Sequence, residues 1–290
     1  MSSDSITISE LKRSLQKNLL LLFPGNEALS ISKLILEHFG FTSLEIVKDP
    51  AAIVQNKIHS EIKKIVNELG RNRPIQYILG EAYFYDLIFK VTEDTLIPRP
   101  ETEELVSNIL LDVSMDEARI MDIGTGSGCI AVTLARHLLK AEIHAMDLHE
   151  SILQIARENA KRNHARVIFH QDDILNYTSQ KKYGKFDVIV SNPPYVTQED
   201  RKWMEPRVLE YEPEIALFVP QDDPLIFFKQ ILRFASSHLA ADGHIWVEIN
   251  EKKGKETSSL FLDSGYQDVR IVKDIHGKDR FIKANNKSKY

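Results

Sequence analysis

The sequence predicts an α/β protein whose seven-stranded, mostly parallel sheet has an antiparallel last strand and follows a small helical domain and a β-hairpin connector. Three observations support this fold class. Short strand patterns alternate with helical patterns from Arg119 onward, as in βαβ units. Apolar residues recur every three or four positions between Ile6 and Gly70, which is typical of helices. Two further strand patterns flank His276-Gly277 and predict a closing hairpin.

The composition is that of an ordinary globular protein. Of the 290 residues, 43% are hydrophobic and 27% are charged, which excludes wholesale disorder and leaves room for two domains. The early apolar stretch Leu19–Phe23 is too short for a membrane span or a secretion signal. A single cysteine, Cys129, excludes an internal disulfide and favours a reducing cytoplasm. The net charge of −5 argues against a dedicated nucleic-acid-binding protein.

Residues 1–72 are predicted to form the helical domain. Leu11, Leu15 and Leu19 would lie on one face of the first helix. Asp49-Pro50 places an N-cap residue before a proline, so we expect a third helix to begin at Pro50 and to end at Leu69, before Gly70.

Residues 73–100 are predicted to connect the two domains. The stretch from Arg73 to Lys90 is rich in aromatic and β-branched residues, with Gly80 as a break, and this favours a hairpin. Pro100 then has the position of a first helical residue and is followed by acidic residues, which are favourable in a first turn.

Residues 101–290 are predicted to form the α/β domain. The expected strands are Arg119–Ile123, Ile143–Asp147, Val167–His170, Phe186–Ser191, His244–Ile249, Gln267–Lys273 and Asp279–Lys283. The segment from Val196 to Asp223 has no strong period. A loop of that length in a compact domain is usually functional or disordered.

The fourth of these strands runs directly into Asn192-Pro193-Pro194-Tyr195. Two prolines cannot continue the strand, so Asn192 would stand at its carboxyl end, where open α/β sheets bind ligands. The Asn192 side-chain oxygen and the Pro193 carbonyl could each accept one proton of a planar NH₂ group, with the Tyr195 ring on its flat face. The alternative is a strand end closed by a Pro-Pro turn, with Tyr195 in the core.

A glycine-rich loop follows the first strand, and its residues are Gly124, Thr125, Gly126, Ser127 and Gly128. Such a loop lets the backbone approach a ligand at a helix N-terminus. Cys129 stands where the third glycine of the dinucleotide fingerprint would fall, and no Gly-Lys-Ser/Thr follows, so neither that fingerprint nor a P-loop is present. We interpret Cys129 as a packing residue behind the loop.

Two more carboxylates follow successive strands. Asp147 ends the second strand, where it could bind a ribose diol. Asp173 follows the third, where it could accept from an adenine amine, with Ile174 against the ring. Each alone would more often be a helix cap or a surface acid, but their arrangement with the glycine loop and Asn192 favours a ligand site.

This combination resembles the class I S-adenosylmethionine-dependent methyltransferases, and within them the release-factor glutamine methyltransferase family. The resemblance spans Arg73 to the C-terminus, with a weaker helical match before it. Its motifs are Arg73-Pro74-Ile75-Gln76-Tyr77-Ile78-Leu79-Gly80, Ile97-Pro98-Arg99-Pro100-Glu101-Thr102-Glu103, the glycine loop, Asn192-Pro193-Pro194-Tyr195 and Glu212-Pro213-Glu214-Ile215-Ala216-Leu217. Two departures are Leu148-His149, where the family often has Ser-Pro, and Asn250, where it often has glycine after Glu248-Ile249.

The resemblance implies a Rossmann-like catalytic domain and methylation of the glutamine amide in the Gly-Gly-Gln motif of class I peptide chain release factors. S-adenosylmethionine would be the cofactor and S-adenosylhomocysteine the product. The cofactor site would comprise Gly124–Gly128, Asp147, Asp173, Ile174 and Asn192, while Asn192–Tyr195 would bind substrate and Asn192, Pro193 and Tyr195 would serve catalysis. The helical domain would recognise the release factor, and the protein would be a cytoplasmic monomer.

Two rival functions satisfy part of the same pattern. An adenine-amino methyltransferase acting on DNA or RNA would present the same NH₂ group to Asn192, although the acidic balance disfavours it. A binding protein that keeps the fold without turnover is disfavoured by the intact glycine loop. No metal is expected, because the ten histidines lack ligand spacing, and we interpret His137, His144 and His170 as helix or strand-edge residues.

Overall fold

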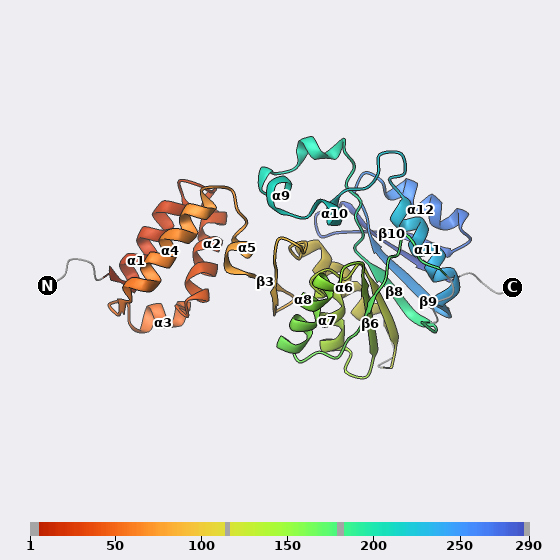
Figure 1. Ribbon diagram of the computed structural model, residues 1–290, viewed down its shortest axis with the longest axis horizontal. Coiled ribbons are helices and arrows are strands. Elements are labelled where there is room, and N and C mark those ends of the chain that lie inside the picture. The colour runs from red at the N-terminus through yellow and green to blue at the C-terminus, as the bar shows by residue number, and fades with distance from the viewer. Residues whose placement is uncertain (1–5, 114–116, 179–182, 287–290) are drawn as a thin grey trace. The chain divides into compact units, whose positions relative to one another are not determined.

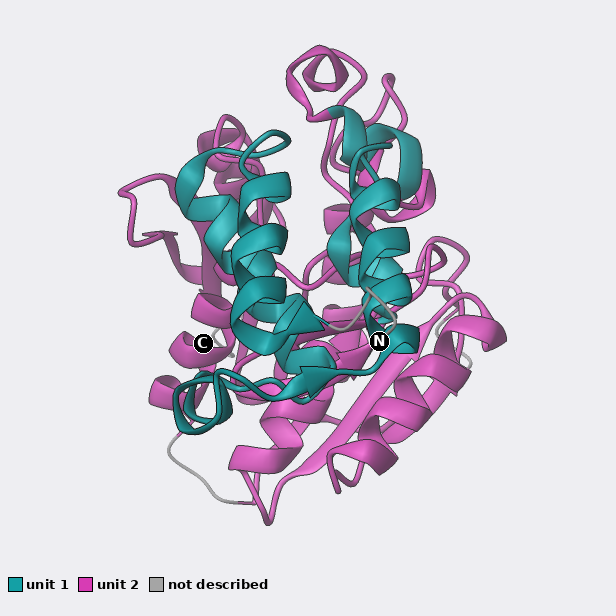
Figure 2. Ribbon diagram, turned by 90° about the vertical axis from the view of Figure 1, so that its left-hand side faces the viewer, with its two compact units in different colours: residues 1–80, 206–211 teal, residues 81–205, 212–290 magenta. Residues whose placement is uncertain are grey.

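The computed structural model describes residues 6–113, 117–178 and 183–286. The chain divides into two compact units, coloured separately in Figure 2. The helical unit consists of Met1–Gly80 together with Pro206–Tyr211, and the sheet unit of Glu81–Glu205 together with Glu212–Tyr290. No helix among the described residues is both long and apolar enough to cross a lipid bilayer.

The helical unit is built from helices, most of which contribute residues to one core. These are α1 (Ile8–Leu19), α2 (Gly25–His38), α3 (Ser43–Lys48), α4 (Asn56–Leu69), α5 (Ile75–Leu79) and α9 (Pro206–Tyr211). Leu11, Leu15 and Leu19 are buried in this core, in keeping with their spacing.

The helix expected to begin at Pro50 is α4, which begins only at Asn56, because the chain makes a strand first. β1 (Ile6–Thr7) and β2 (Ile53–Val54) pair antiparallel. The carbonyls of Pro50 and Ala52 accept hydrogen bonds from the backbone N–H groups of Ser9 and Ile8, at 3.1 and 2.9 Å. These N–H groups lie in the first turn of α1, where no partner exists within the helix. The tertiary contact therefore outweighs the local Asp49-Pro50 start signal.

The predicted hairpin is present but shorter than expected. β3 (Glu81–Phe84) and β4 (Leu87–Lys90) pair across Tyr85 and Asp86, whose φ angles of 50° and 61° are typical of a two-residue hairpin turn. The preceding residues form α5 instead of strand. α5 begins after Pro74 and ends at Gly80, whose φ of 71° is easily adopted by glycine.

The sheet unit contains the predicted seven-stranded sheet, visible in Figure 1. Its order is β10-β11-β9-β8-β5-β6-β7, and only β11 runs against the others. The strands are β5 (Arg119–Ile123), β6 (Glu142–Asp147), β7 (Ile168–Gln171), β8 (Phe186–Ser191), β9 (Leu239–Glu248), β10 (Gln267–Lys273) and β11 (Asp279–Asn285). The predicted fold class is confirmed, and most strand boundaries lie within two residues of their expected positions.

β9 is the main exception, since it begins five residues before the expected His244. Phe186 of β8 pairs with Leu239, and Val188 pairs with His244, so β9 is irregular between these two pairs. The sequence pattern indicated only the regular part of the strand, after Gly243.

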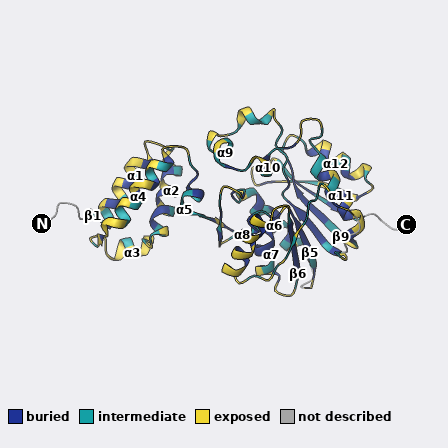
Figure 3. Cartoon of the chain, in the orientation of Figure 1, coloured by how far each residue is buried: buried dark blue, intermediate teal, exposed yellow. Residues whose placement is uncertain are grey.

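Helices cover both faces of the sheet. α6 (Pro100–Asp112), α7 (Cys129–His137) and α8 (Glu150–Arg162) contribute to one core cluster, and α11 (Ile226–His238) and α12 (Gly254–Asp263) to the other. Alternate strand residues enter alternate clusters, as Val188 and Ile189 of β8 do. The central strands β5 and β8 are accordingly almost entirely buried (Figure 3), whereas the edge strands β7 and β10 are partly exposed. Both faces of the sheet are covered, as is usual for a parallel sheet.

The Val196–Asp223 segment is an ordered loop with short helices. η1 (Asp200–Trp203) and α10 (Glu214–Leu217) flank α9. Val196 forms an isolated parallel bridge with Phe218, so the two ends of the loop meet. Between these ends the chain contributes α9 to the helical unit, where Arg207 pairs with Glu27 at 2.6 Å.

Candidate active site

A cavity lies at the carboxyl ends of four neighbouring strands, β8, β5, β6 and β7. Its lining includes groups that follow each of these strands: Asn192, the loop from Gly124 to Ser127, Asp147, and Asp173 with Ile174. The structure thus brings most of the residues singled out in the sequence around one space, but Pro193 and Tyr195 are not among the residues that line it. Pro194 also lines the cavity, whereas Gly128 packs beneath the loop.

The glycine loop presents its backbone to the cavity. Gly124 and Gly126 have φ angles of 72° and 55°, and a Cβ atom added to either would meet no protein atom within 4 Å. Gly128 differs, because a Cβ there would lie 3.2 Å from the Cβ of Ala156 in α8. Two glycines therefore leave space for a ligand, and the third permits close helix packing.

Asp147 is tied to this loop. Its Oδ2 accepts a hydrogen bond from the backbone N–H of Gly126 at 2.9 Å. Burial raises the pKa of Asp147, while backbone N–H donors, that of Gly126 first, oppose the increase. A carboxylate is an acceptor with several lone pairs, so it can also receive a hydroxyl of a ribose.

Asp173 is partly engaged by its own turn. Its Oδ1 accepts from the backbone N–H of Leu175 at 2.8 Å, and its Oδ2 from the side chain of Asn176 at 2.7 Å. No helix follows Asp173, so it caps a turn rather than a helix, and it also lines the cavity. Asp172, which the sequence did not single out, lines it too and accepts a hydrogen bond from the Tyr183 hydroxyl.

The side chain of Asn192 is hydrogen-bonded to Thr102, a residue of α6. Its Nδ2 donates to Thr102 Oγ1 at 3.1 Å. Thr102 donates to Glu248 Oε2 at 2.8 Å, and the Tyr195 hydroxyl donates to Glu248 Oε1 at the same distance. Tyr195 also packs against the core cluster that includes α11. Its hydroxyl is thus engaged with Glu248, while the Tyr195 side chain is only partly buried.

Arg99 and Glu212 join two of the motifs quoted from the sequence. Arg99 Nη2 lies 2.6 Å from Glu212 Oε1, and the backbone N–H of Ile97 donates to Glu212 Oε2 at 3.3 Å. Glu212 is buried, whereas Arg99 lines the cavity. This pair fixes the return of the Val196–Asp223 loop, and Ile215 and Ala216 after it line the cavity.

The charges around the cavity fit a cationic ligand with a nucleoside. Asp147, Asp172 and Asp173 contribute carboxylates to the lining, while the cation of Arg99 is already paired with Glu212. A positively charged sulfonium would be attracted to such an environment. Ile152 and Ile174 supply apolar surface for a base. The residues present therefore fit S-adenosylmethionine.

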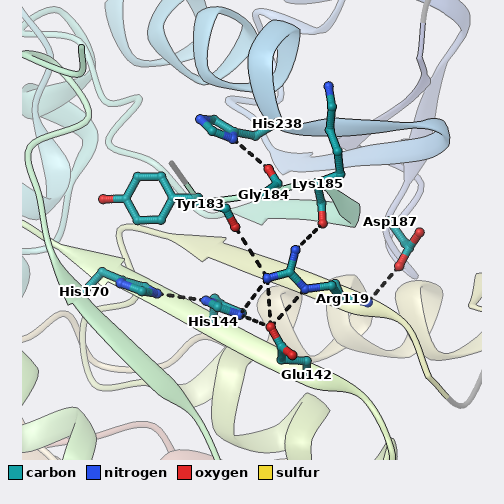
Figure 4. A network of polar contacts seen from close by, with 9 residues as sticks. All are labelled: Arg119, Glu142, His144, His170, Tyr183, Gly184, Lys185, Asp187 and His238. Carbon is teal, nitrogen blue, oxygen red and sulfur yellow. Dashed lines mark hydrogen bonds and ion pairs between the residues drawn. The ribbon is translucent and has the colours of Figure 1, made fainter. Parts of the chain in front are cut away.

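A second polar cluster lies around the amino-terminal ends of β5, β6 and β8 (Figure 4). Arg119 donates to Glu142 and to the Lys185 carbonyl, at 2.8 and 2.6 Å. His144 Nδ1 and His170 Nε2 lie 2.8 Å apart. His144 is buried rather than at a strand edge. The cluster satisfies polar groups where three strands begin, which is a structural role.

Comparisons with known proteins agree with this geometry. A model of the methyltransferase small domain family matches residues 102–209. The release factor glutamine methyltransferase of Bacteroides thetaiotaomicron is 40% identical over 265 residues, covering 91% of this chain and 95% of the relative. That of Flavobacterium psychrophilum is 40% identical over 269 residues, covering 91% and 94%. A methyltransferase structure from Pyrococcus furiosus, 19% identical, superposes with a TM-score of 0.52 and covers 76% of this chain and 97% of its own, which supports the fold.

Proposed function

Because the chain belongs to the release factor glutamine methyltransferase family, we propose that it transfers a methyl group from S-adenosylmethionine to a glutamine side-chain amide nitrogen of a class I peptide chain release factor. The observation that carries this proposal is the position of Asn192 in the lining of the cavity at the strand ends. The target glutamine would be that of the Gly-Gly-Gln motif. We keep the sequence-based expectation of a cytoplasmic monomer.

The reaction needs alignment more than a base. An amide nitrogen is a poor nucleophile, because its lone pair is delocalised into the carbonyl. S-adenosylmethionine supplies an activated sulfonium methyl group. In our proposal, Asn192 Oδ1 and the Pro193 carbonyl accept the two N–H groups of the substrate amide and hold its nitrogen in line with that methyl. Their dipoles also favour the positive charge that develops on the nitrogen.

The remaining lining residues would hold the cofactor. Asp147 would accept the ribose hydroxyls, and the backbone of Gly124 and Gly126 would border the methionine part. Asp173 and Ile174 would contact the adenine. The cavity-lining carboxylates would balance the sulfonium charge.

We assign release factor recognition to the helical unit. It has its own core and contains none of the cavity-lining residues. It also holds α9, which the chain forms between Tyr195 and Glu212. A release factor bound to the helical unit would therefore contact the unit that includes α9. This helix belongs to the loop that follows Asn192–Tyr195 in the chain.

Transfer of a labelled methyl group tests the function directly. Purified enzyme and S-adenosylmethionine are incubated separately with a class I release factor, DNA and RNA. We expect label on the release factor, at the Gly-Gly-Gln glutamine in tryptic mass spectra. A release factor whose glutamine is replaced by alanine should stay unlabelled. Preferential labelling of DNA or RNA would instead support the adenine-amino methyltransferase function.

Removal of the helical unit tests its assigned role. A chain starting at Glu81, after the boundary between the units, is expected to bind S-adenosylmethionine like the full chain but to methylate intact release factor poorly. A short Gly-Gly-Gln peptide serves as the control substrate, because it lacks the rest of the release factor. Its slow methylation should be similar in both chains. Full activity of the fragment on intact release factor would contradict the assignment.

A further inference from the structure

A buried chain of hydrogen bonds ends at the side chain of Asn192. Glu248, at the end of β9, is 1% exposed, and Thr102, in the first turn of α6, is 2% exposed. Glu248 accepts hydrogen bonds from both Thr102 and Tyr195, and Thr102 contacts the Asn192 amide. These residues come from three separate parts of the sequence, and each depends on the next for its hydrogen-bonding partner.

The direction of the chain follows from the donors available. A threonine hydroxyl has one proton, and an ionised carboxylate can only accept. The Thr102 proton is therefore used on Glu248, which leaves only its lone pairs for Asn192. The group of Asn192 that faces Thr102 must be a donor, namely Nδ2. Asn192 Oδ1 is then on the other branch of the amide and available to accept.

We propose that Thr102 and Glu248 are positioning residues that select this orientation of the Asn192 amide, so that an acceptor rather than a donor meets the substrate NH₂ group. The inference rests on the proposed role of Asn192. With the amide reversed, its NH₂ would face the NH₂ of the glutamine, and neither group could accept. The orientation therefore decides whether the substrate amide is bound or repelled.

Tyr195 is the second residue that donates a hydrogen bond to Glu248. Its hydroxyl donates to the other Glu248 oxygen, so each carboxylate oxygen receives one buried hydroxyl. Burial raises the pKa of Tyr195 well above its usual value, and the charge of Glu248 adds to the effect, so the phenol remains a donor. Glu248 thus fixes both ends of Asn192-Pro193-Pro194-Tyr195, and the Pro193 carbonyl lies between two anchored side chains.

Substitution of Thr102 provides the main test. With purified release factor and saturating S-adenosylmethionine, Thr102→Val should lower kcat about tenfold or more, as expected for a lost hydrogen bond at a buried, oriented group. Thr102→Ser keeps the hydroxyl and should restore most of the rate. Cofactor affinity, measured by calorimetry, should change less than about threefold in both variants, which also shows that they are folded.

Thr133→Val is the matched control. Thr133 is fully buried in α7, and its hydroxyl makes no hydrogen bond in the structure. The chemical change is the same, but it leaves intact the hydrogen bonds from Glu248 through Thr102 to Asn192, which we call the relay. The rate should therefore stay near that of the wild type. A Thr102→Val rate near the wild-type value would overturn the proposal. Equal impairment of Thr102→Ser and Thr102→Val would also overturn it, because the hydroxyl would then not matter.

The pH profile gives a readout that packing alone would not change. Burial raises the pKa of Glu248, whereas the Thr102 and Tyr195 hydrogen bonds and Arg280 oppose the rise and Glu101 adds to it. Protonated Glu248 could donate to Thr102, which could then donate to Asn192 and reverse the amide. At saturating cofactor, kcat should fall as the pH decreases through this raised pKa. Glu248→Gln should be slow and lack that fall, and an unchanged profile would contradict the relay.

Asn192→Ala in the same assays distinguishes the proposed role of Asn192 from the positioning role of Thr102 and Glu248. Loss of activity in Asn192→Ala with a normal rate in Thr102→Val would leave the proposed role of Asn192 intact and reject the relay. Normal activity in Asn192→Ala would reject the role of Asn192 itself. Loss in both, with rescue by Thr102→Ser, supports both.

Discussion

Replacing Asn192 with alanine is expected to lower the rate of methyl transfer by about 10²–10³-fold, because one preorganised hydrogen-bond partner at the reacting nitrogen is lost. The cofactor would still be held by the glycine loop, Asp147 and Asp173, so much of its affinity should remain. The measurement is single-turnover methyl transfer at saturating S-adenosylmethionine, which isolates the chemical step from product release.

Two further variants sharpen this experiment. Asn192→Asp keeps an acceptor but adds a negative charge beside the sulfonium, so it should bind cofactor more tightly while retaining only partial activity. Asn108→Ala is a control on α6, where the side chain donates to the Glu104 carbonyl in the same helix. If Asn192→Ala and Asn108→Ala both transferred methyl at the wild-type rate, Asn192 would be no more than a strand cap.

Much of the fold could be predicted because local patterns and tertiary structure agree in the sheet unit. Strands such as β5 and β8 are short apolar runs that end where polar or glycine residues follow, and parallel packing buries both of their faces. Pro100 likewise begins α6 as expected, with Glu101 and Glu103 in its first turn. In these segments no distant contact opposes the local preference.

The misplaced boundaries occur where a distant segment decides the conformation. The residues after Pro50 form β2 because β1 and the start of α1 offer them hydrogen-bond partners. Ile75 and Tyr77 have side chains that suit a strand, yet both are buried within helix α5. Strand preference mainly reflects packing on a half-buried surface, and α5 buries these side chains equally well.

In the candidate site, too, some residues could be predicted from local sequence, whereas others depend on contacts between distant segments. Strand-end polar residues could be found in the sequence because a parallel sheet places all its carboxyl strand ends at one edge. Thr102 and Glu248 could not, since they lie 146 positions apart and neither has a distinctive local pattern. Both do occur within or beside the quoted motifs, in Ile97–Glu103 and in the departure at Glu248-Ile249-Asn250. Only the folded chain reveals their contact and their link to Asn192.

Asp147→Ala should weaken S-adenosylmethionine binding by about 1–3 kcal/mol, or roughly 5–150-fold in Kd, because the ribose hydroxyls lose their acceptor. The backbone N–H of Gly126 also loses its partner. A thermal unfolding curve of the free variant measures any damage to the loop. Asp147→Asn retains one acceptor oxygen and should lie between the wild type and alanine.

The pH dependence of cofactor binding distinguishes the carboxylate from general loop damage. Burial raises the pKa of Asp147, and the ionised form is the one that binds, so affinity should weaken as the pH falls through that raised pKa. Titration calorimetry across this range should show the weakening in the wild type and a flatter dependence in Asp147→Ala. Unchanged affinity in a folded Asp147→Ala protein would remove Asp147 from the cofactor site. NAD binding by the wild type as strong as S-adenosylmethionine binding would refute the interpretation of the glycine loop, in which Cys129 stands where the third glycine of the dinucleotide fingerprint would fall.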